Sequence, residues 1–351
     1  MDNLVHKRNY SLDIARIIAT LSVVMTHCCS YFLEKHPLFS NEFIIGNLFD
    51  SLSRIGVPLF IMISGSLFLD ERKDITLKSV LFKNIKCIAI IIIIWSTIYS
   101  IAYNVILPIS SNNTISIKNI IGGIINGPYH MWYLYMIIGL YIMTPFLRKF
   151  VCKENKEMVL AFITISLCFQ FFTPVVNIIC KLGIDLSLIN EWMTKFELDF
   201  FGGYLAYYLV GWYIVNVGIK QKLHKNIIYL LGATSLVLII LYVHFTGDYK
   251  NAYKNIGMPV FVYSVSVFLA LNNITWKLKE KITKKLATLS NLTFGVYMIH
   301  ALLVTIYIKL FPYNGHCILY IIVYFMVVIF FASLISYTIS KIPLLRKIIK
   351  T

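Results

Sequence analysis

The chain has 351 residues, of which 58% are hydrophobic and only 14% are charged, and its formal net charge is +16. Soluble globular domains carry about a quarter charged residues, so this composition excludes a soluble enzyme and indicates a polytopic membrane protein. The positive residues form no stripe with interleaved aromatics, which excludes a nucleic-acid-binding surface.

Apolar segments follow one another along the whole chain, and a membrane-spanning helix needs roughly 20 apolar residues. The pattern predicts about ten such helices, near residues 11–33, 43–69, 84–106, 130–148, 158–179, 200–217, 226–245, 256–272, 291–311 and 316–340. The first segment is long and lacks a small-residue cleavage site, so we expect it to be retained rather than removed as a signal peptide. We therefore predict an all-α membrane helix bundle forming a single domain over residues 1–351, with residues 107–129 as an outside loop.

The positions of Lys and Arg predict the orientation of this bundle. With the N-terminus placed in the cytoplasm, the inside segments hold 23 of these cations and the outside segments hold 7. Arg16 and Arg54 are the remaining two, and both lie within predicted spans. Because cytoplasmic loops of membrane proteins carry an excess of Lys and Arg, we predict cytoplasmic N- and C-termini in a multi-pass protein of the cell membrane.

The seven cysteines show no pattern that suggests a disulfide framework or a metal site. Their number is odd, and neither a C-x-x-C pair nor a Cys/His ligand spacing occurs. We therefore expect no metal cofactor.

Arg16 and His27 lie eleven residues apart in the first predicted span. Eleven residues make about three helical turns, so both side chains leave the same face of one helix, ~16 Å apart along its axis. Ionisable groups within a membrane usually face a bundle interior or an aqueous cavity, so this face is a candidate for chemistry. Alternatively, Arg16 could snorkel to the headgroups or pair with Asp13, and His27 could only be hydrogen-bonded across helices.

Further polar residues lie within other predicted spans. Arg54 is deep in the second span, where snorkelling is difficult, although a purely structural pairing is an alternative. Tyr297 and His300 are three residues apart in the ninth span and therefore share a helix face.

The fourth predicted span opens on a group of aromatic residues. His130, Trp132 and Tyr133 lie at its outer end, where Trp and Tyr also occur as ordinary interfacial belt residues. In the second span, the Ser64-Gly65 pair is explained more simply as a site of close helix packing.

Four segments resemble, in the correct order, the motifs of the membrane acyltransferase 3 family. Arg16 and His27 match its R-x10-H signature, and the other three segments are residues 54–65 (RIGVPLFIMISG), 130–135 (HMWYLY) and 294–300 (FGVYMIH). Many members have Val-Asp where this chain has Val57-Pro58, and the form found here resembles that of surface-polysaccharide O-acetyltransferases. The chain is also similar to the stand-alone members, which lack an extra extracytoplasmic esterase-like domain.

The resemblance implies transfer of an acyl group, most often acetyl, from acetyl-CoA to a hydroxyl of a cell-envelope polysaccharide or lipid-linked sugar. The catalytic residues would be His27, as general base or as carrier of the acyl group, and Arg16 and Arg54, which would guide the donor and later oppose the developing negative charge. The remaining candidates form two groups: Asp13, Ser64, Tyr297 and His300 for the donor and reaction chamber, and His130, Trp132 and Tyr133 for the acceptor side. Lys83, Lys86 and the 277–285 loop could hold nucleotide phosphates, although their role as topology signals is the simpler explanation.

Two other functions remain open at this point. A transporter or flippase for a sugar or amino acid would also need deep charges, although no inverted repeat and no matching pair of broken helices is visible in the sequence. A substrate-binding membrane half of another enzyme is the second alternative. The sequence does not distinguish acetyl from succinyl or another acyl group, and it does not identify the acceptor.

Overall fold

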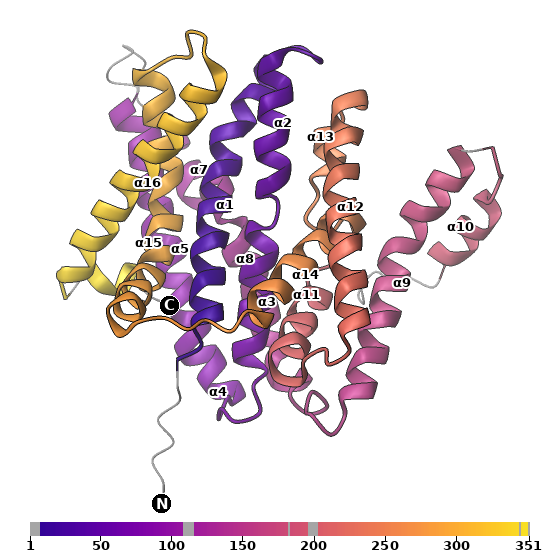
Figure 1. Cartoon of the computed structure of the whole chain (residues 1–351). Helices are drawn as coiled ribbons and strands as arrows, with labels where there is room; N and C mark the ends of the chain where they lie inside the picture. The colour runs from indigo at the N-terminus through magenta and orange to yellow at the C-terminus, as the bar shows by residue number, and fades with distance from the viewer. Residues whose placement is uncertain (1–7, 108–115, 182, 196–202, 344, 350–351) are drawn as a thin grey trace, which may run out of the picture. The chain divides into compact units, whose positions relative to one another are not determined.

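The computed structural model describes residues 8–107, 116–181, 183–195, 203–343 and 345–349, and every regular element among them is a helix (Figure 1). Within the described ranges, eight helical segments are long and apolar enough to cross a membrane. They are Tyr10–Lys35, Asn41–Phe68, Leu77–Ile106, Ile117–Leu147, Lys156–Asn177, Lys222–Thr246, Glu280–Leu310 and Cys317–Lys341. The prediction of an all-α polytopic membrane bundle is therefore confirmed.

The other two predicted spans, 200–217 and 256–272, correspond to shorter helices. In the first of these spans, residues 200–202 lie outside the described part. Helix α11 (Tyr204–Trp212) then continues directly into a π-helical segment, η5 (Tyr213–Val217). The second is α14 (Met258–Asn273), which has 16 residues. A count of ten crossings therefore depends on whether these two short helices also cross the bilayer.

The chain divides into two compact units, each built from separate stretches of sequence. The first unit comprises residues 1–53, 75–145 and 276–351, and the second comprises residues 54–74 and 146–275.

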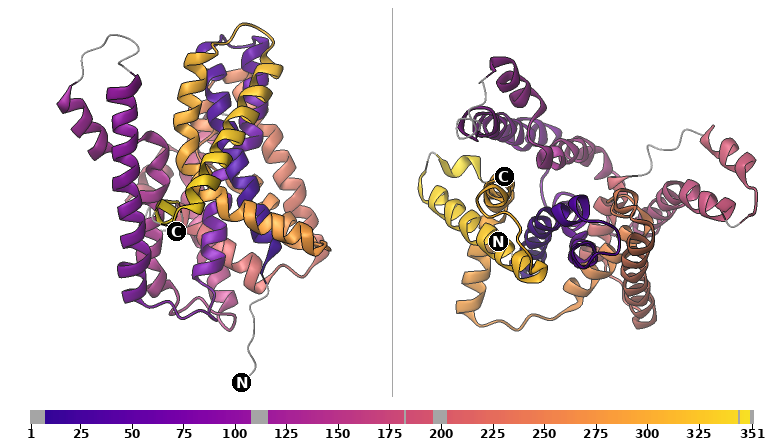
Figure 2. Two further views of the ribbon diagram at one scale, coloured as in Figure 1. Left: turned by 90° about the vertical axis from the view of Figure 1, so that its left-hand side faces the viewer. Right: turned by 90° about the horizontal axis from the view of Figure 1, so that it is seen from above.

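The first unit contains most of the predicted site residues. Its elements are α1 (Tyr10–Lys35), α2 (Asn41–Ser53), α4 (Leu77–Ser79), η1 (Val80–Ile85), α5 (Lys86–Ile101), η2 (Ala102–Ile106), α7 (Ile117–Asn126), η3 (Tyr129–Met131), most of α8 (Trp132–Leu147), α15 (Glu280–Leu310), α16 (Cys317–Lys341) and η6 (Leu345–Ile348). Helix α1 packs against α2, α15 and α16 (Figure 2). The residues at these contacts are buried and apolar, as Ala15, Val24 and Phe32 illustrate.

Helices α1 and α15 run in the same direction. Asn9 caps the start of α1 by accepting hydrogen bonds from the backbone N–H groups of Ser11 and Leu12, the usual role of Asn at this position. Near that end the Ser290 hydroxyl of α15 donates to Asp13. Further along both helices the rings of His27 and His300 are neighbours, so the two helices are parallel.

The prediction of a loop over residues 107–129 is corrected in part, because α7 lies within it. Ile117, Ile121 and Ile125 recur every four residues and share one exposed face of this helix. On the opposite side, the Ser100 hydroxyl donates to the Ile120 carbonyl at 2.6 Å. The many Asn, Ser and Gly residues around α7 obscured this helical spacing in the sequence.

The second unit contains α3 (Gly56–Phe68), α9 (Lys156–Lys181), α10 (Ser187–Thr194), α11, η5, α12 (Lys222–Thr246), α13 (Tyr249–Ala252) and α14. Helices α3 and α11 touch through their backbones. A Cβ on Gly65 would overlap the Tyr208 carbonyl, and one on Gly211 would overlap the Met62 carbonyl. The close-packing explanation of Gly65 is therefore confirmed, since only glycine lets two helix backbones approach this closely.

The second predicted span is interrupted at Arg54 and Ile55, which form a turn between α2 and α3. Pro58 explains the interruption, because it has no N–H to donate to the Arg54 carbonyl four residues earlier and its ring would clash there. The first hydrogen bond of the new helix joins the Leu59 N–H to the Ile55 carbonyl at 2.9 Å. Arg54 is thus placed at a helix break rather than within a continuous helix.

Candidate active site

Three histidines from three different helices meet in the first unit. His27 lies on α1, His130 lies in the turn η3 just before α8, and His300 lies on α15. The ring centroids of His27 and His300 are 5.2 Å apart, as are those of His130 and His300. We call this group the histidine cluster.

The chain turn that brings His130 into the cluster has a simple local cause. Helix α7 ends at Gly127, which has φ +66°, a left-handed conformation that glycine adopts without strain. Pro128 follows and has an extended conformation. The chain therefore changes direction sharply after α7 and begins α8 beside α15.

Tyrosine hydroxyls hold the backbone around the histidine cluster. The Tyr297 hydroxyl donates to the His130 carbonyl at 2.5 Å. The Tyr99 hydroxyl donates to the Met298 carbonyl at 2.8 Å and accepts from the Leu302 N–H at 3.1 Å. The Tyr99 ring also lies 5.0 Å from that of His130. Together these contacts connect α5, α15 and the start of α8 around the three imidazoles.

The hydrogen bond made by His300 defines its tautomer. Its Nδ1 lies 2.6 Å from the Tyr297 carbonyl oxygen, which can only accept, so Nδ1 carries the proton. In the neutral ring Nε2 then presents a lone pair. This nitrogen is buried and has no hydrogen-bond partner among the described residues.

His130 is buried with similarly unsatisfied nitrogens. Only 2% of its surface is exposed, and among the described residues neither ring nitrogen has a hydrogen bond of normal geometry, although the ring lies near the Met298 backbone. Burying such a group without a partner costs about 1–3 kcal/mol. His27, by contrast, is half-buried. The cluster therefore combines two buried imidazoles, each with at least one nitrogen that lacks a partner among the described residues, with a third that is more accessible.

Arg16 and Asp13 form a separate network nearer the start of α1. Arg16 Nη1 lies 3.4 Å from Asp13 Oδ1, as the pairing alternative predicted. Asp13, which is 1% exposed, also accepts from Arg8 Nε at 2.5 Å and from the Ser290 hydroxyl at 2.7 Å. The hydrogen bond to Asp13 raises the pKa of the Arg8 guanidinium. With ~16 Å of helix between Arg16 and His27, the structure does not bring Arg16 to the histidine cluster.

The other predicted residues lie as follows. Trp132 is 39% exposed, which suits an interfacial belt residue, and the Tyr133 ring lies 6.0 Å from that of Tyr297. Arg54 and Ser64 belong to the second unit. There the Arg54 guanidinium lies 4.0 Å from the ring centroid of Tyr253, a cation–π contact, and Ser64 is half-buried on α3.

Sequence reasoning missed Tyr99 and Tyr129, which both border the cluster. The Tyr129 ring lies 5.2 Å from that of His27 and 5.6 Å from that of His130. Tyr99 occurs in an isoleucine-rich run, where an aromatic residue indicates only an apolar helix. For Tyr129, its position beside His130 was the available signal.

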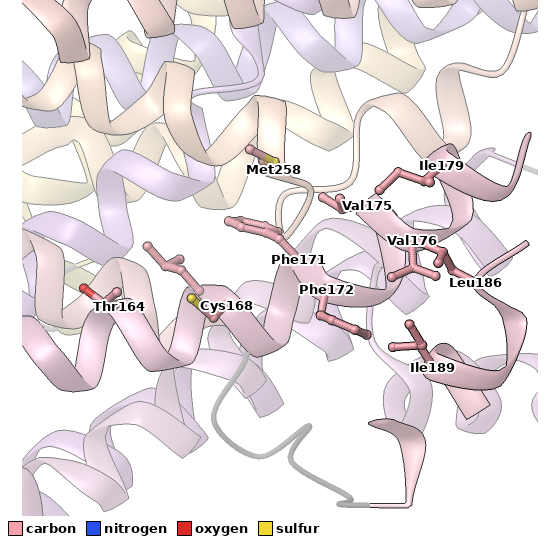
Figure 3. A pocket seen from close by; sticks show the side chains of 11 residues that line it. Thr164, Cys168, Phe171, Phe172, Val175, Val176, Ile179, Leu186, Ile189 and Met258 are labelled. Carbon is pink, nitrogen blue, oxygen red and sulfur yellow. The ribbon is translucent and has the colours of Figure 1, made fainter. Parts of the chain in front are cut away.

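The second unit contains an apolar cavity of about 600 Å³ between α9 and α10 (Figure 3). Its walls include Phe171, Val176 and Ile189, and none of the described residues that line it is charged. Cys168 is the one ionisable side chain among these described residues, and no His, Asp or Glu accompanies it there, so the cavity is a weaker candidate for the chemistry than the histidine cluster. Among the described residues no group of three or more His, Cys, Asp or Glu side chains could hold a metal ion.

Comparison with known proteins shows the family of this chain. The model of the acyltransferase 3 family, described as an acyltransferase domain, matches residues 9–337. No curated protein and no solved structure gave a match. The matched range includes all three histidines, Arg16 and Arg54, and it covers nearly the whole chain. The protein belongs to the acyltransferase 3 family and is a multi-pass membrane acyltransferase.

Proposed function

We propose that this protein is an O-acyltransferase of the cell membrane that moves an acetyl group from acetyl-CoA to a hydroxyl of a cell-envelope polysaccharide or lipid-linked sugar. The observation that carries the proposal is the histidine cluster, in which His130 and His300 keep buried ring nitrogens that have no hydrogen-bond partner of normal geometry in the described part of the chain. A sugar hydroxyl is a poor nucleophile, and an imidazole is the side chain best suited to activate it near neutral pH.

The proposed reaction proceeds by general base catalysis. His27 takes the proton of the acceptor hydroxyl while the hydroxyl oxygen forms a bond to the thioester carbonyl carbon, and the carbonyl electrons move to oxygen. The resulting oxyanion then collapses and breaks the C–S bond. The leaving thiolate of coenzyme A takes the proton back from the His27 imidazolium, so the products are the sugar ester and free coenzyme A.

The other two imidazoles have complementary roles in this proposal. Nε2 of His300 accepts a hydrogen bond from a neighbouring hydroxyl of the sugar and so orients the reacting hydroxyl towards His27. A neutral His130 has one N–H, which would donate to the developing oxyanion, and a donor fixed in a dry site is effective there. Tyr297 holds the backbone at His130 and is therefore a positioning residue.

Arg16 has a different proposed role because of its distance from His27. A guanidinium about three helical turns away cannot reach the oxyanion. We assign Arg16, together with Arg54, to guiding the phosphate-bearing donor from the cytoplasmic side.

A direct assay tests the proposal. Purified protein in nanodiscs is given radiolabelled acetyl-CoA and an envelope glycan fraction, and both free coenzyme A and glycan label are measured. The His27→Ala variant is expected to lose about 10²–10⁴-fold in rate. The matched control is His224→Ala, which changes an exposed histidine at the start of α12 and is expected to keep wild-type activity.

The alternative results are equally informative. Full transfer by His27→Ala would remove this residue from the catalytic role. If neither protein turned over any acyl donor while the wild type moved a sugar across vesicles, the transporter alternative would replace the proposal. The breaks at Arg54 and at Gly127–Pro128 give that outcome a structural basis, since transporters bind their substrates at broken helices.

A further inference from the structure

A second feature of the first unit lies on α5, on a different helix face from Tyr99. Here α5 and the C-terminal turn η6 enclose a groove of about 910 Å³. Along α5 the groove is lined by Ile90, Ile94 and Ile98, which recur every four residues on one face of the helix. From Lys83 to Ile98 this strip rises ~22 Å, more than half of a ~30 Å hydrocarbon core.

The groove combines this apolar strip with positive charge. Lys83 and Lys86 lie at the start of the strip, and Arg346 and Lys347 of η6 form the opposite wall. All four are exposed, and no acidic residue lines the groove within the described part of the chain. Ile90 and Ile98 are 46% and 37% exposed, so the strip is accessible from the lipid.

The wall formed by η6 is attached to the bundle. The Trp95 indole N–H donates to the Ile348 carbonyl at 3.0 Å, and Ile349 is 1% exposed. Figure 2 shows the C-terminal turn lying against α5. Residues 345–349 lie beyond the range 9–337 that matches the family model.

We propose that the groove binds an anionic phospholipid, with one acyl chain along the isoleucine strip and the phosphate between the two cationic walls. Basic pockets at the cytoplasmic ends of membrane helices recognise anionic headgroups, and each Lys or Arg near the surface adds attraction. An acyl-CoA donor fits less well, because the strip offers almost no hydrogen-bonding side chains to the amides of its pantetheine arm. The proposal does not depend on the proposed acyl transfer.

Lipid retention after purification tests the proposal without any measurement of turnover. The protein is incubated in detergent with phosphatidylglycerol or with phosphatidylcholine of the same acyl chains, and bound lipid is counted by native mass spectrometry. The wild type is expected to prefer phosphatidylglycerol. Replacing Lys83, Lys86, Arg346 and Lys347 by Ala is expected to weaken phosphatidylglycerol binding at least about tenfold.

A matched control removes the same charge elsewhere in the first unit. Lys277, Lys279, Lys281 and Lys285 are exposed and do not line the groove, so replacing them by Ala is expected to leave binding unchanged. Equal losses in both variants would mean nonspecific attraction and would overturn the site, as would a wild type that does not distinguish the two lipids.

A second pair of variants keeps the charge constant. Ile90→Trp fills the groove, whereas Ile93→Trp makes the same change at a 62% exposed position that does not line it. Only the first is expected to reduce lipid binding, and equal behaviour of the two would contradict the proposal. If a long-chain acyl-CoA displaced the lipid from the wild type but not from Ile90→Trp, and phosphatidylglycerol bound only weakly, the groove would belong to the donor instead.

Discussion

Asp13 is a site residue predicted from the sequence, and the structure shows which contacts it makes. Its carboxylate is almost completely buried and accepts hydrogen bonds from Arg8, Arg16 and Ser290. These contacts join the start of α1 to α15, the two helices that carry His27 and His300. These contacts fix the helices on which the histidine cluster depends, and the role of Asp13 in the donor chamber stays a prediction.

Replacing Asp13 by Asn is expected to lower the free energy of unfolding by about 2–4 kcal/mol, because two guanidinium groups lose their buried counter-charge. The expected readout is a lower thermal midpoint in detergent, with near-normal turnover per folded molecule. Ser290→Ala removes one hydrogen bond and serves as the milder comparison, at about 1 kcal/mol. An unchanged midpoint with lost turnover would place Asp13 in the reaction itself.

At the scale of elements, two kinds of helix contact position the machinery differently. In the first unit, hydroxyls of Tyr99 and Tyr297 tie backbone groups of neighbouring helices together. In the second unit, α3 and α11 instead meet through Gly65 and Gly211, backbone against backbone. Both kinds of contact fix the positions of helices that carry family motifs. The distance across either contact can change only if a helix moves.

Gly65→Ala and Gly211→Ala are each expected to destabilise the protein by about 1–3 kcal/mol, because the added methyl group overlaps a carbonyl of the facing helix. The matched control is Gly139→Ala on α8, where a Cβ meets nothing within 4 Å. It is expected to be neutral or slightly stabilising, since alanine favours a helix over glycine. Thermal midpoints of the three variants check this, and similar values for all three would contradict the backbone contact.

For the whole molecule, the direction of α1 and α15 constrains the topology. Parallel spanning helices must be separated by an odd number of crossings. The ten predicted spans place seven between them, and the eight long helical segments place five. Either α11 and α14 both cross the bilayer or neither does, because a single additional crossing would make α1 and α15 antiparallel. Cytoplasmic termini remain a prediction from the charge distribution.

Cysteine labelling in intact cells decides whether the chain crosses the membrane eight or ten times. Lys250 and Lys279 are exposed residues on either side of α14. If α14 crosses, Lys250→Cys reacts with a membrane-impermeant maleimide from outside, whereas Lys279→Cys reacts only after permeabilisation. The native cysteines define the background in the unmodified protein. Labelling of both variants from the same side would show that α14 does not cross.

By itself, the sequence determined the membrane class, the all-helical fold and the resemblance to the acyltransferase 3 family, because hydropathy, charge and short motifs are local properties of a chain. Periodicity also correctly placed Arg16 and His27 on one helix, and it left several alternatives for Arg16, of which the structure shows the pairing with Asp13. Only the tertiary structure brought His130 to His27 and His300, added Tyr99 beside them and attached the C-terminal turn to α5. Those contacts join residues that are distant along the chain, so they depend on how helices pack and where they break, as at Pro58 and Gly127, and not on any local pattern.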